Sequence, residues 1–220
     1  MNRSQYHSKV MNAVPAGFFE DTLRCLCQSY GEAYKRGHED YPDSEAHDLI
    51  PHLRRANVER DMRNLAQRHG LHGRAALNVI RNSFHTRIIM DDIVMTISAT
   101  MSPNEKVRDA EFRKSYANDP QCHLPLFPED PPTIDIRRDG LYVLLKHGPN
   151  CEDPAKLGFA RIVFPTPDCS GYACEDIDLW AKFSHVLKDF YAPAHNDAGV
   201  PPDAPPPPIK IKQQRPEEQA

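Results

Sequence analysis

The sequence has no long hydrophobic run. Its amino-terminal stretch, MNRSQYHSKVMNAVPAGFFE, lacks the apolar segment of about 7–15 residues that a secretory signal requires. No segment approaches the roughly 18 consecutive apolar residues of a membrane-spanning helix. We therefore expect a cytoplasmic protein without a membrane partner.

Cysteine is also scarce, with six residues in a chain of 220. This number is too small for a disulfide scaffold, and a reducing compartment would keep the thiols free. One set resembles a zinc site, because Cys169 and Cys174 stand five residues apart, with Cys151 upstream and His185 downstream. The spacing Cys-x4-Cys lies at the edge of the range typical of zinc sites. We therefore interpret these cysteines as buried thiols and expect no cofactor.

The common catalytic motifs are missing as well. The sequence contains no His-Glu-x-x-His, no Gly-x-Ser-x-Gly and no phosphate loop. A metal-dependent nuclease often places an acid on one strand and an acid-x-lysine on the next, so that carboxylates hold Mg²⁺ beside a lysine. Asp135 and Lys146 fit this outline, but Leu144 occupies the position of the second acid. A non-enzymatic protein is therefore expected, with a degenerate nuclease site as the alternative.

Positive charge is concentrated in one part of an acidic chain. The formal net charge of the whole chain is −4. Residues 51–90 nevertheless contain eight arginines and only two acids, a local balance of +6. Phosphate recognition depends on where cations cluster, so this basic segment indicates a polyanionic partner.

The basic segment contains the stretch LAQRHGLHGRAALNVIRN (residues 65–82), whose pattern predicts two helices around a glycine corner. It resembles the helix-turn-helix families of repressors over about 20 residues. His69 departs from their pattern by standing where an apolar residue is usual, and Gly73 places a second glycine at the start of the second helix. The resemblance implies a recognition helix from about Arg74 to Asn82.

The resemblance also assigns two kinds of contact with nucleic acid. Arg74, Asn78 and Arg81 would read base edges, because arginine can pair with guanine and asparagine with adenine. Phosphates would be contacted by the arginines of the preceding helix, Arg54, Arg55, Arg60 and Arg63. We therefore predict a nucleic-acid-binding or regulatory accessory protein, by analogy with factors of bacterial and phage defence or toxin systems. The alternative is an interaction module whose arginines bind an acidic protein.

Hydrophobic periodicity predicts the secondary structure. Helices are expected over about 17–34, 51–69, 74–82, 103–116 and 175–191, the fourth starting at a capping box of Ser102 and Glu105. Alternating residues predict a hairpin over 84–98, a pair of strands at 133–138 and 141–147, and a strand at 158–164. The two hairpin turns are expected at Asp91-Asp92 and Asp139-Gly140.

This order of elements predicts an α+β fold, with a helical N-terminal part followed by a mainly antiparallel sheet of about five strands and two helices. We assign residues 1–83 to the helical region and 84–191 to the sheet region, together forming one compact domain. Residues 192–220 contain eight of the 21 prolines and no periodicity, which predicts a disordered tail. The tail is either solubilising or a ligand for a protein partner, which could also bind the sheet region.

Overall fold

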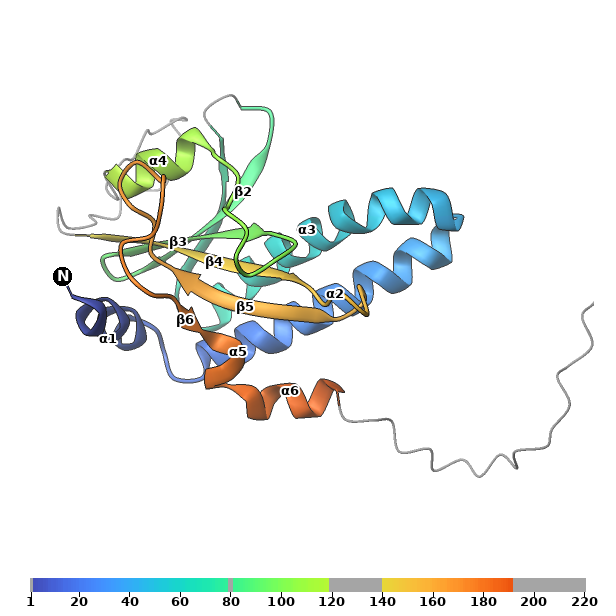
Figure 1. Cartoon of the computed structure of the whole chain (residues 1–220), viewed down its shortest axis with the longest axis horizontal. Coiled ribbons are helices and arrows are strands. Elements are labelled where there is room, and N and C mark those ends of the chain that lie inside the picture. The colour runs from blue at the N-terminus through green and yellow to red at the C-terminus, as the bar shows by residue number, and fades with distance from the viewer. Residues whose placement is uncertain (1, 79–80, 119–139, 192–220) are drawn as a thin grey trace, which may run out of the picture.

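The computed structural model describes residues 2–78, 81–118 and 140–191. Within these ranges the chain forms the predicted α+β fold (Figure 1). The helices are α1 (Arg3–Ala13), α2 (Phe18–Asp40), α3 (Asp43–Arg68), α4 (Glu111–Asn118), α5 (Leu179–Lys182) and α6 (Ser184–Tyr191). The strands are β1 (His72–Leu77), β2 (Phe84–Met90), β3 (Ile93–Ala99), β4 (Leu141–Pro149), β5 (Leu157–Val163) and β6 (Ile177–Asp178).

The six described strands form one sheet in the order β1-β2-β3-β4-β5-β6. Neighbouring strands are antiparallel, except that β3 and β4 are parallel. The prediction of a mainly antiparallel sheet is therefore confirmed, with six strands instead of about five. The hairpin at Asp91-Asp92 is also confirmed, because Met90 pairs with Ile93 across a two-residue turn. Asp91 has a φ of 51°, the left-handed conformation that such turns use.

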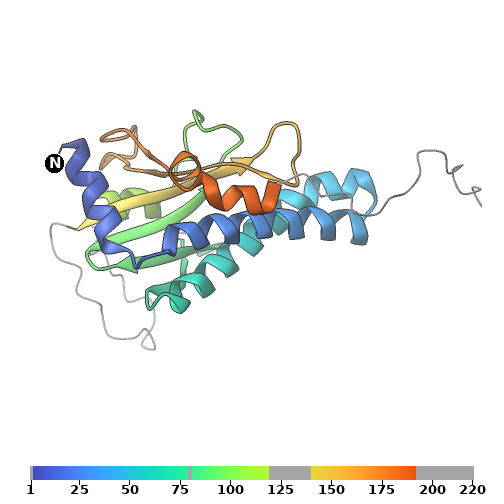
Figure 2. The ribbon, with the colours of Figure 1, turned by 90° about the horizontal axis from the view of Figure 1, so that it is seen from below.

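The long helices α2 and α3 lie side by side against one face of the sheet, and α6 runs along α2 (Figure 2). The main core between these helices and the sheet includes Phe18, Met62, Ile88 and Leu145. A smaller core on the opposite face joins Tyr116 of α4 to strand side chains such as Val94 and Tyr142. Because successive strand residues point to opposite faces, both cores are built from the same central strands. The predicted helical and sheet regions therefore share one core.

The predicted recognition helix is wrong, because residues 72–77 form strand β1. This strand pairs with β2 from His72 opposite Ile89 to Leu77 opposite Phe84. Gly70, with a φ of 71°, follows the end of α3. A Cβ atom added to Gly73 would lie 2.8 Å from the Cβ of Ala66, so β1 passes directly against α3. Helix propensity is a weak preference, and pairing with β2 overrides it here.

The helix predicted over 103–116 is wrong in its first half, since α4 begins only at Glu111. The Glu105 carboxylate accepts a hydrogen bond from the Met101 amide, 2.7 Å away. The carbonyls of Pro103 and Glu105 accept hydrogen bonds from the Lys146 ammonium, which is 1% exposed. A buried ammonium without partners is very costly. The carbonyls that a helix would use internally therefore serve Lys146.

Two other helix predictions need correction. The polar segment after residue 34 belongs mainly to α2 and α3, which are separated only by Tyr41 and Pro42. The helix expected over 175–191 is divided into β6, α5 and α6, because Asp178 pairs with β5 and its side chain caps α5 by accepting from the Ala181 amide.

The predicted strand at 133–138 and the proline-rich tail lie outside the described residues. Among the described helices, none is long and apolar enough to cross a membrane.

Candidate functional site

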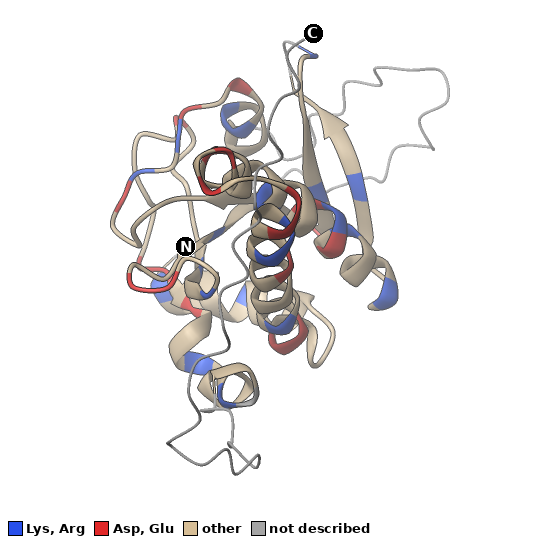
Figure 3. Ribbon diagram, turned by 90° about the vertical axis from the view of Figure 1, so that its right-hand side faces the viewer, with Lys and Arg blue, Asp and Glu red and all other residues tan. Residues whose placement is uncertain are grey.

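The arginines predicted to contact phosphates do not form one surface. Figure 3 shows basic and acidic residues interspersed along the helices. Arg54 is only 7% exposed, and its guanidinium lies 4.4 Å from the centre of the Tyr30 ring. Arg60 contacts the Asp61 carboxylate at 2.7 Å, and Arg63 donates to the Thr86 hydroxyl at 2.9 Å. These guanidinium groups therefore have partners inside the protein.

The residues predicted to read bases are likewise not on a helix. Arg74 lies on β1, opposite Arg87 of β2. Asn78 and Arg81 lie between β1 and β2, where the Asn78 side chain donates to Asn82 and Ser83. The Arg81 amide donates to the Asn78 carbonyl. The structure thus gives no helical reading surface, while nucleic-acid binding itself remains a prediction.

The nuclease and zinc alternatives gain no support. Asp135 lies outside the described residues, and the Lys146 ammonium is bound to the Pro103 and Glu105 carbonyls. His185 lies near Glu20, with 3.6 Å between its Nε2 and the carboxylate. Among the described residues no group of three or more His, Cys, Asp or Glu side chains is placed to hold a metal ion. The structure therefore does not assemble Cys169, Cys174 and His185 into a metal site.

The sheet splits between β2 and β3. Their pairing runs from Met90 and Ile93 to Arg87 and Thr96 and then stops, although both strands continue. In a regular ladder after a two-residue turn, Thr86 and Ile97 would exchange backbone hydrogen bonds. Instead the Thr86 amide donates to the Glu59 carboxylate. A side chain of α3 therefore takes the place of the neighbouring strand.

A second side chain of α3 strengthens the split. Arg55 donates to the Phe84 carbonyl at 3.0 Å, so it binds the β2 backbone one step further along. The Glu59 carbonyl also accepts from the Thr86 hydroxyl at 2.9 Å. The end of β2 is thus held by α3, and among the described residues no strand pairs with the facing part of β3 on this side.

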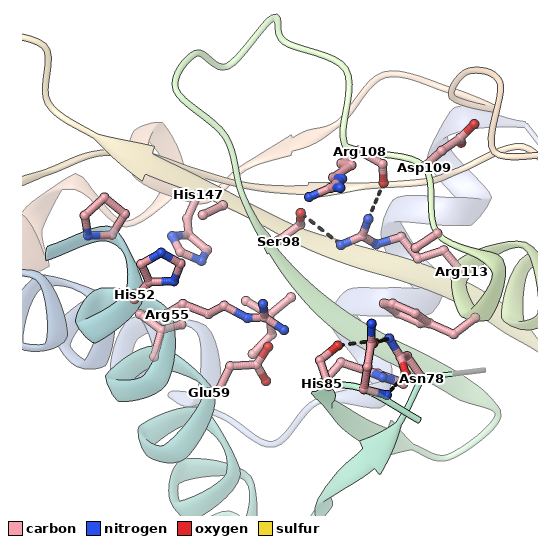
Figure 4. A pocket seen from close by; sticks show the side chains of 18 of the residues that line it. His52, Arg55, Glu59, Asn78, His85, Ser98, Arg108, Asp109, Arg113 and His147 are labelled. Carbon is pink, nitrogen blue, oxygen red and sulfur yellow. Dashed lines mark hydrogen bonds between the residues drawn. The ribbon is translucent and has the colours of Figure 1, made fainter. Parts of the chain in front are cut away.

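The split opens into a cavity of about 590 Å³ (Figure 4). On one side, His52, Arg55 and Glu59 project from α3. Arg108, Phe112 and Arg113 line the other side, with His85 of β2 and His147 of β4 also in the wall. Three successive residues of β3, 97–99, line the cavity. Because strand side chains alternate between faces, three successive residues are exposed to it only where the strand edge itself forms the wall.

The acids of the cavity wall have bonding partners within the protein, whereas its arginines form no ion pairs with described residues. Its acids are already engaged, because Asp109 and Glu111 lie within 3.9 and 3.1 Å of the Lys114 ammonium and Glu59 is bound to Thr86. Its three arginines, Arg55, Arg108 and Arg113, form no salt bridge with any described carboxylate. The wall therefore contains three guanidinium groups that form no ion pair with a described carboxylate, although the charge of Glu59 acts on both Arg55 and Arg113.

Two nitrogen atoms of the wall are buried without a hydrogen-bond partner among the described residues: Nε of Arg113 and Nδ1 of His85. Arg113 is half-buried, and its terminal nitrogens donate to the Arg108 carbonyl and to the Ser98 hydroxyl. The His85 ring stacks on Phe112 with 3.8 Å between centroids. Buried polar atoms almost always have partners. Both atoms belong to residues that line the cavity.

Two buried histidines of the wall, His85 and His147, are neutral at pH 7. Burial, together with the positive charges of Arg113 and Arg55, lowers the pKa of His85 to about 4. Burial and the charge of Arg54 lower the pKa of His147 to about 3. Burial raises the pKa of Glu59, against the opposing effect of its hydrogen bonds from Thr86 and of Arg55. These two histidines therefore add no positive charge to that of the arginines.

Among the residues of this wall, the sequence had singled out Arg55 and Asn78, both as contacts with nucleic acid. The spacing of His52, Arg55 and Glu59, three and four residues apart, does place them on one face of a helix. No local pattern marks His85, Ser98 or Arg113, because they approach α3 only through the folding of the sheet.

Comparison of the chain with models of protein families, with curated proteins and with solved structures gave no match. Its function is therefore inferred from the chemistry of the cavity.

Proposed function

We propose that the protein binds a small anionic ligand in the cavity between β2 and β3. The observation that carries this proposal is a set of three arginines, Arg55, Arg108 and Arg113, none of which forms an ion pair with a described carboxylate. Glu59 is the one acid beside them that has no described basic partner within ion-pair distance, so positive charge is in excess at this wall. A carboxylate or phosphate would supply the missing negative charge, and the planar guanidinium binds either group with two parallel hydrogen bonds. The volume of about 590 Å³ lies within the roughly 300–1,000 Å³ typical of small-molecule sites.

The proposal changes what is expected of the basic segment. Arg55 binds the ligand, whereas Arg54, Arg60 and Arg63 stabilise contacts within the protein. Contact with nucleic acid remains a separate proposal, which no longer includes a recognition helix. The proposed role is therefore that of a ligand-binding, non-enzymatic accessory protein.

Isothermal titration with inorganic phosphate, pyrophosphate, adenosine monophosphate and citrate tests the anion site. We expect at least one of these to bind the wild type with a Kd below about 1 mM, and Arg113→Met to weaken it by about tenfold or more, because a charged hydrogen-bonding group is lost. Arg55→Ala should also weaken binding of the same ligand. Because Arg55 is exposed, we expect this variant to fold.

Arg60→Ala is the matched control, because Arg60 is exposed and bound to Asp61 and Glu32 away from the cavity. Unchanged affinity is expected for this variant. Equal binding by wild type and Arg113→Met would contradict the proposal, as would the absence of binding by all four anions and by peptides with a free carboxyl terminus. A gel shift with duplex and single-stranded DNA tests the separate nucleic-acid proposal, which predicts a shift reduced by Arg74→Ala.

A further inference from the structure

We infer that the ligand of this cavity is the carboxyl-terminal end of an extended peptide, which pairs with the open edge of β3. This inference rests on the proposed function and names the class of anion. Three features of the cavity carry it: a strand edge with which no described strand pairs, arginines beside that edge, and an apolar part of the same wall.

The open edge follows from the register of the hairpin. In a two-residue hairpin the residues flanking the turn form a hydrogen-bonded pair, and every second pair after it does the same. Met90 and Ile93 are the first such pair and Ile88 and Met95 the second. Ile97 comes next, so its N–H and C=O point across the split. The amide of Thr86, its regular partner, donates to Glu59 instead.

Of the two strand edges that face the split, the β3 edge is the one that the described residues leave open to a ligand. The β2 side is covered, because Glu59 and Arg55 bind the Thr86 amide and the Phe84 carbonyl. On its other side β3 is fully paired with β4, with Ile97 opposite Leu145. An extended peptide entering the split would therefore add to one strand, the mode of recognition in which main-chain hydrogen bonds provide affinity.

The arginines define where such a peptide ends. Arg113 contacts the Ser98 hydroxyl at 3.1 Å, so its guanidinium lies directly beside the open edge. Arg55 lies on the opposite side of the split, bound to the Phe84 carbonyl. A terminal carboxylate between these two groups would meet two positive charges. The peptide N–H and C=O groups preceding it would reach Ile97.

The apolar part of the wall fits a side chain of the peptide. Pro51 and Phe112 line the same cavity as the arginines and are at least partly exposed. An inorganic anion would use the arginines but would leave the strand edge and this apolar surface without a partner. A peptide carboxylate uses all three features, which is why we favour it.

Two pools of tripeptides with random sequence test the inference, one with free carboxyl termini and one with amidated termini. We expect the free-acid pool to raise the melting temperature of the wild-type protein. The amidated pool should need at least about tenfold higher concentration for the same effect, because it lacks the charge that Arg113 and Arg55 bind. A third pool has free carboxyl termini and a methyl group on the nitrogen of its last amide. It should bind more weakly than the unmodified free-acid pool, because the methylated amide cannot donate a hydrogen bond to the strand edge.

Protein variants separate this inference from the proposed function. Arg113→Met and Arg55→Ala should remove the preference for the free-acid pool, and Arg60→Ala should retain it. Binding of phosphate or adenosine monophosphate without binding of any peptide pool would overturn the peptide inference and leave the anion site in place. Equal effects of the free-acid and amidated pools would also overturn it. If no anion and no peptide binds, both proposals fail.

Discussion

Lowering the pH from 7 to 4.5 should destabilise the protein by several kcal/mol through two buried histidines. His147 is 2% exposed and His85 4% exposed. Burial lowers the pKa of His147 to about 3 and that of His85 to about 4. An unfolded histidine has a pKa of about 6.5, so below pH 6.5 the unfolded chain binds protons that the folded chain does not. At pH 4.5 each histidine should therefore lower the free energy of unfolding by about 2–3 kcal/mol.

The direction of this effect follows from the proton count. The unfolded state holds more protons at low pH, so the stability present above about pH 6.5 is lost progressively toward pH 4 and below. Burial raises the pKa of Glu59, which therefore takes up a proton on folding in mildly acidic solution and partly offsets the loss. The comparison of variants therefore isolates the contribution of one histidine better than the wild-type curve does.

Urea unfolding at pH 7 and pH 4.5 measures the effect. His147→Gln should lose stability at pH 7, because it changes the contact of the ring with the Tyr30 hydroxyl at 2.7 Å. It should nevertheless show a pH dependence smaller by about 2–3 kcal/mol, because glutamine does not titrate. His47→Gln, at an exposed position on α3, serves as the control and should behave as the wild type. Equal losses on acidification in wild type and His147→Gln would argue against a buried neutral His147.

Gly148→Ala should lower the free energy of unfolding by about 3 kcal/mol, because no space exists for a methyl group at this position. A Cβ atom on Gly148 would lie 2.2 Å from the Thr100 carbonyl oxygen and 2.3 Å from the Phe159 ring. Neither group can withdraw easily. The Thr100 amide is bound to the His147 carbonyl, and Phe159 pairs with Gly148 across β4 and β5.

Gly31→Ala is the matched control for this prediction. Gly31 lies within α2, and a Cβ atom added to it meets no atom within 4 Å. Alanine at this position should raise the free energy of unfolding by about 0.5–1 kcal/mol, because glycine is a poor helix former. Denaturant unfolding of both variants at one pH gives the comparison. If Gly148→Ala changed the free energy of unfolding by no more than Gly31→Ala does, this would show that β4 can move away from residue 100.

Local patterns in the sequence predicted the elements that local forces determine. The alternation on both sides of Asp91-Asp92 predicted the β2–β3 hairpin, and the apolar run at 141–147 predicted the buried strand β4. Side-chain period and turn chemistry act over a few residues, so they can be read without the fold. The helix predictions for 103–110 and 74–77 were wrong because distant groups decide the conformation there, namely the Lys146 ammonium and strand β2.

The sequence by itself determined that this protein has an α+β fold, a buried central strand and a segment rich in arginine. Only the tertiary structure decided where those arginines lie and where a ligand can bind. The cavity exists because Glu59 of α3 binds the amide of Thr86, 27 residues away, in place of the next strand. Competition of this kind between a side chain and a backbone ladder depends on the packing of α3 against the sheet, and no local pattern of residues records it.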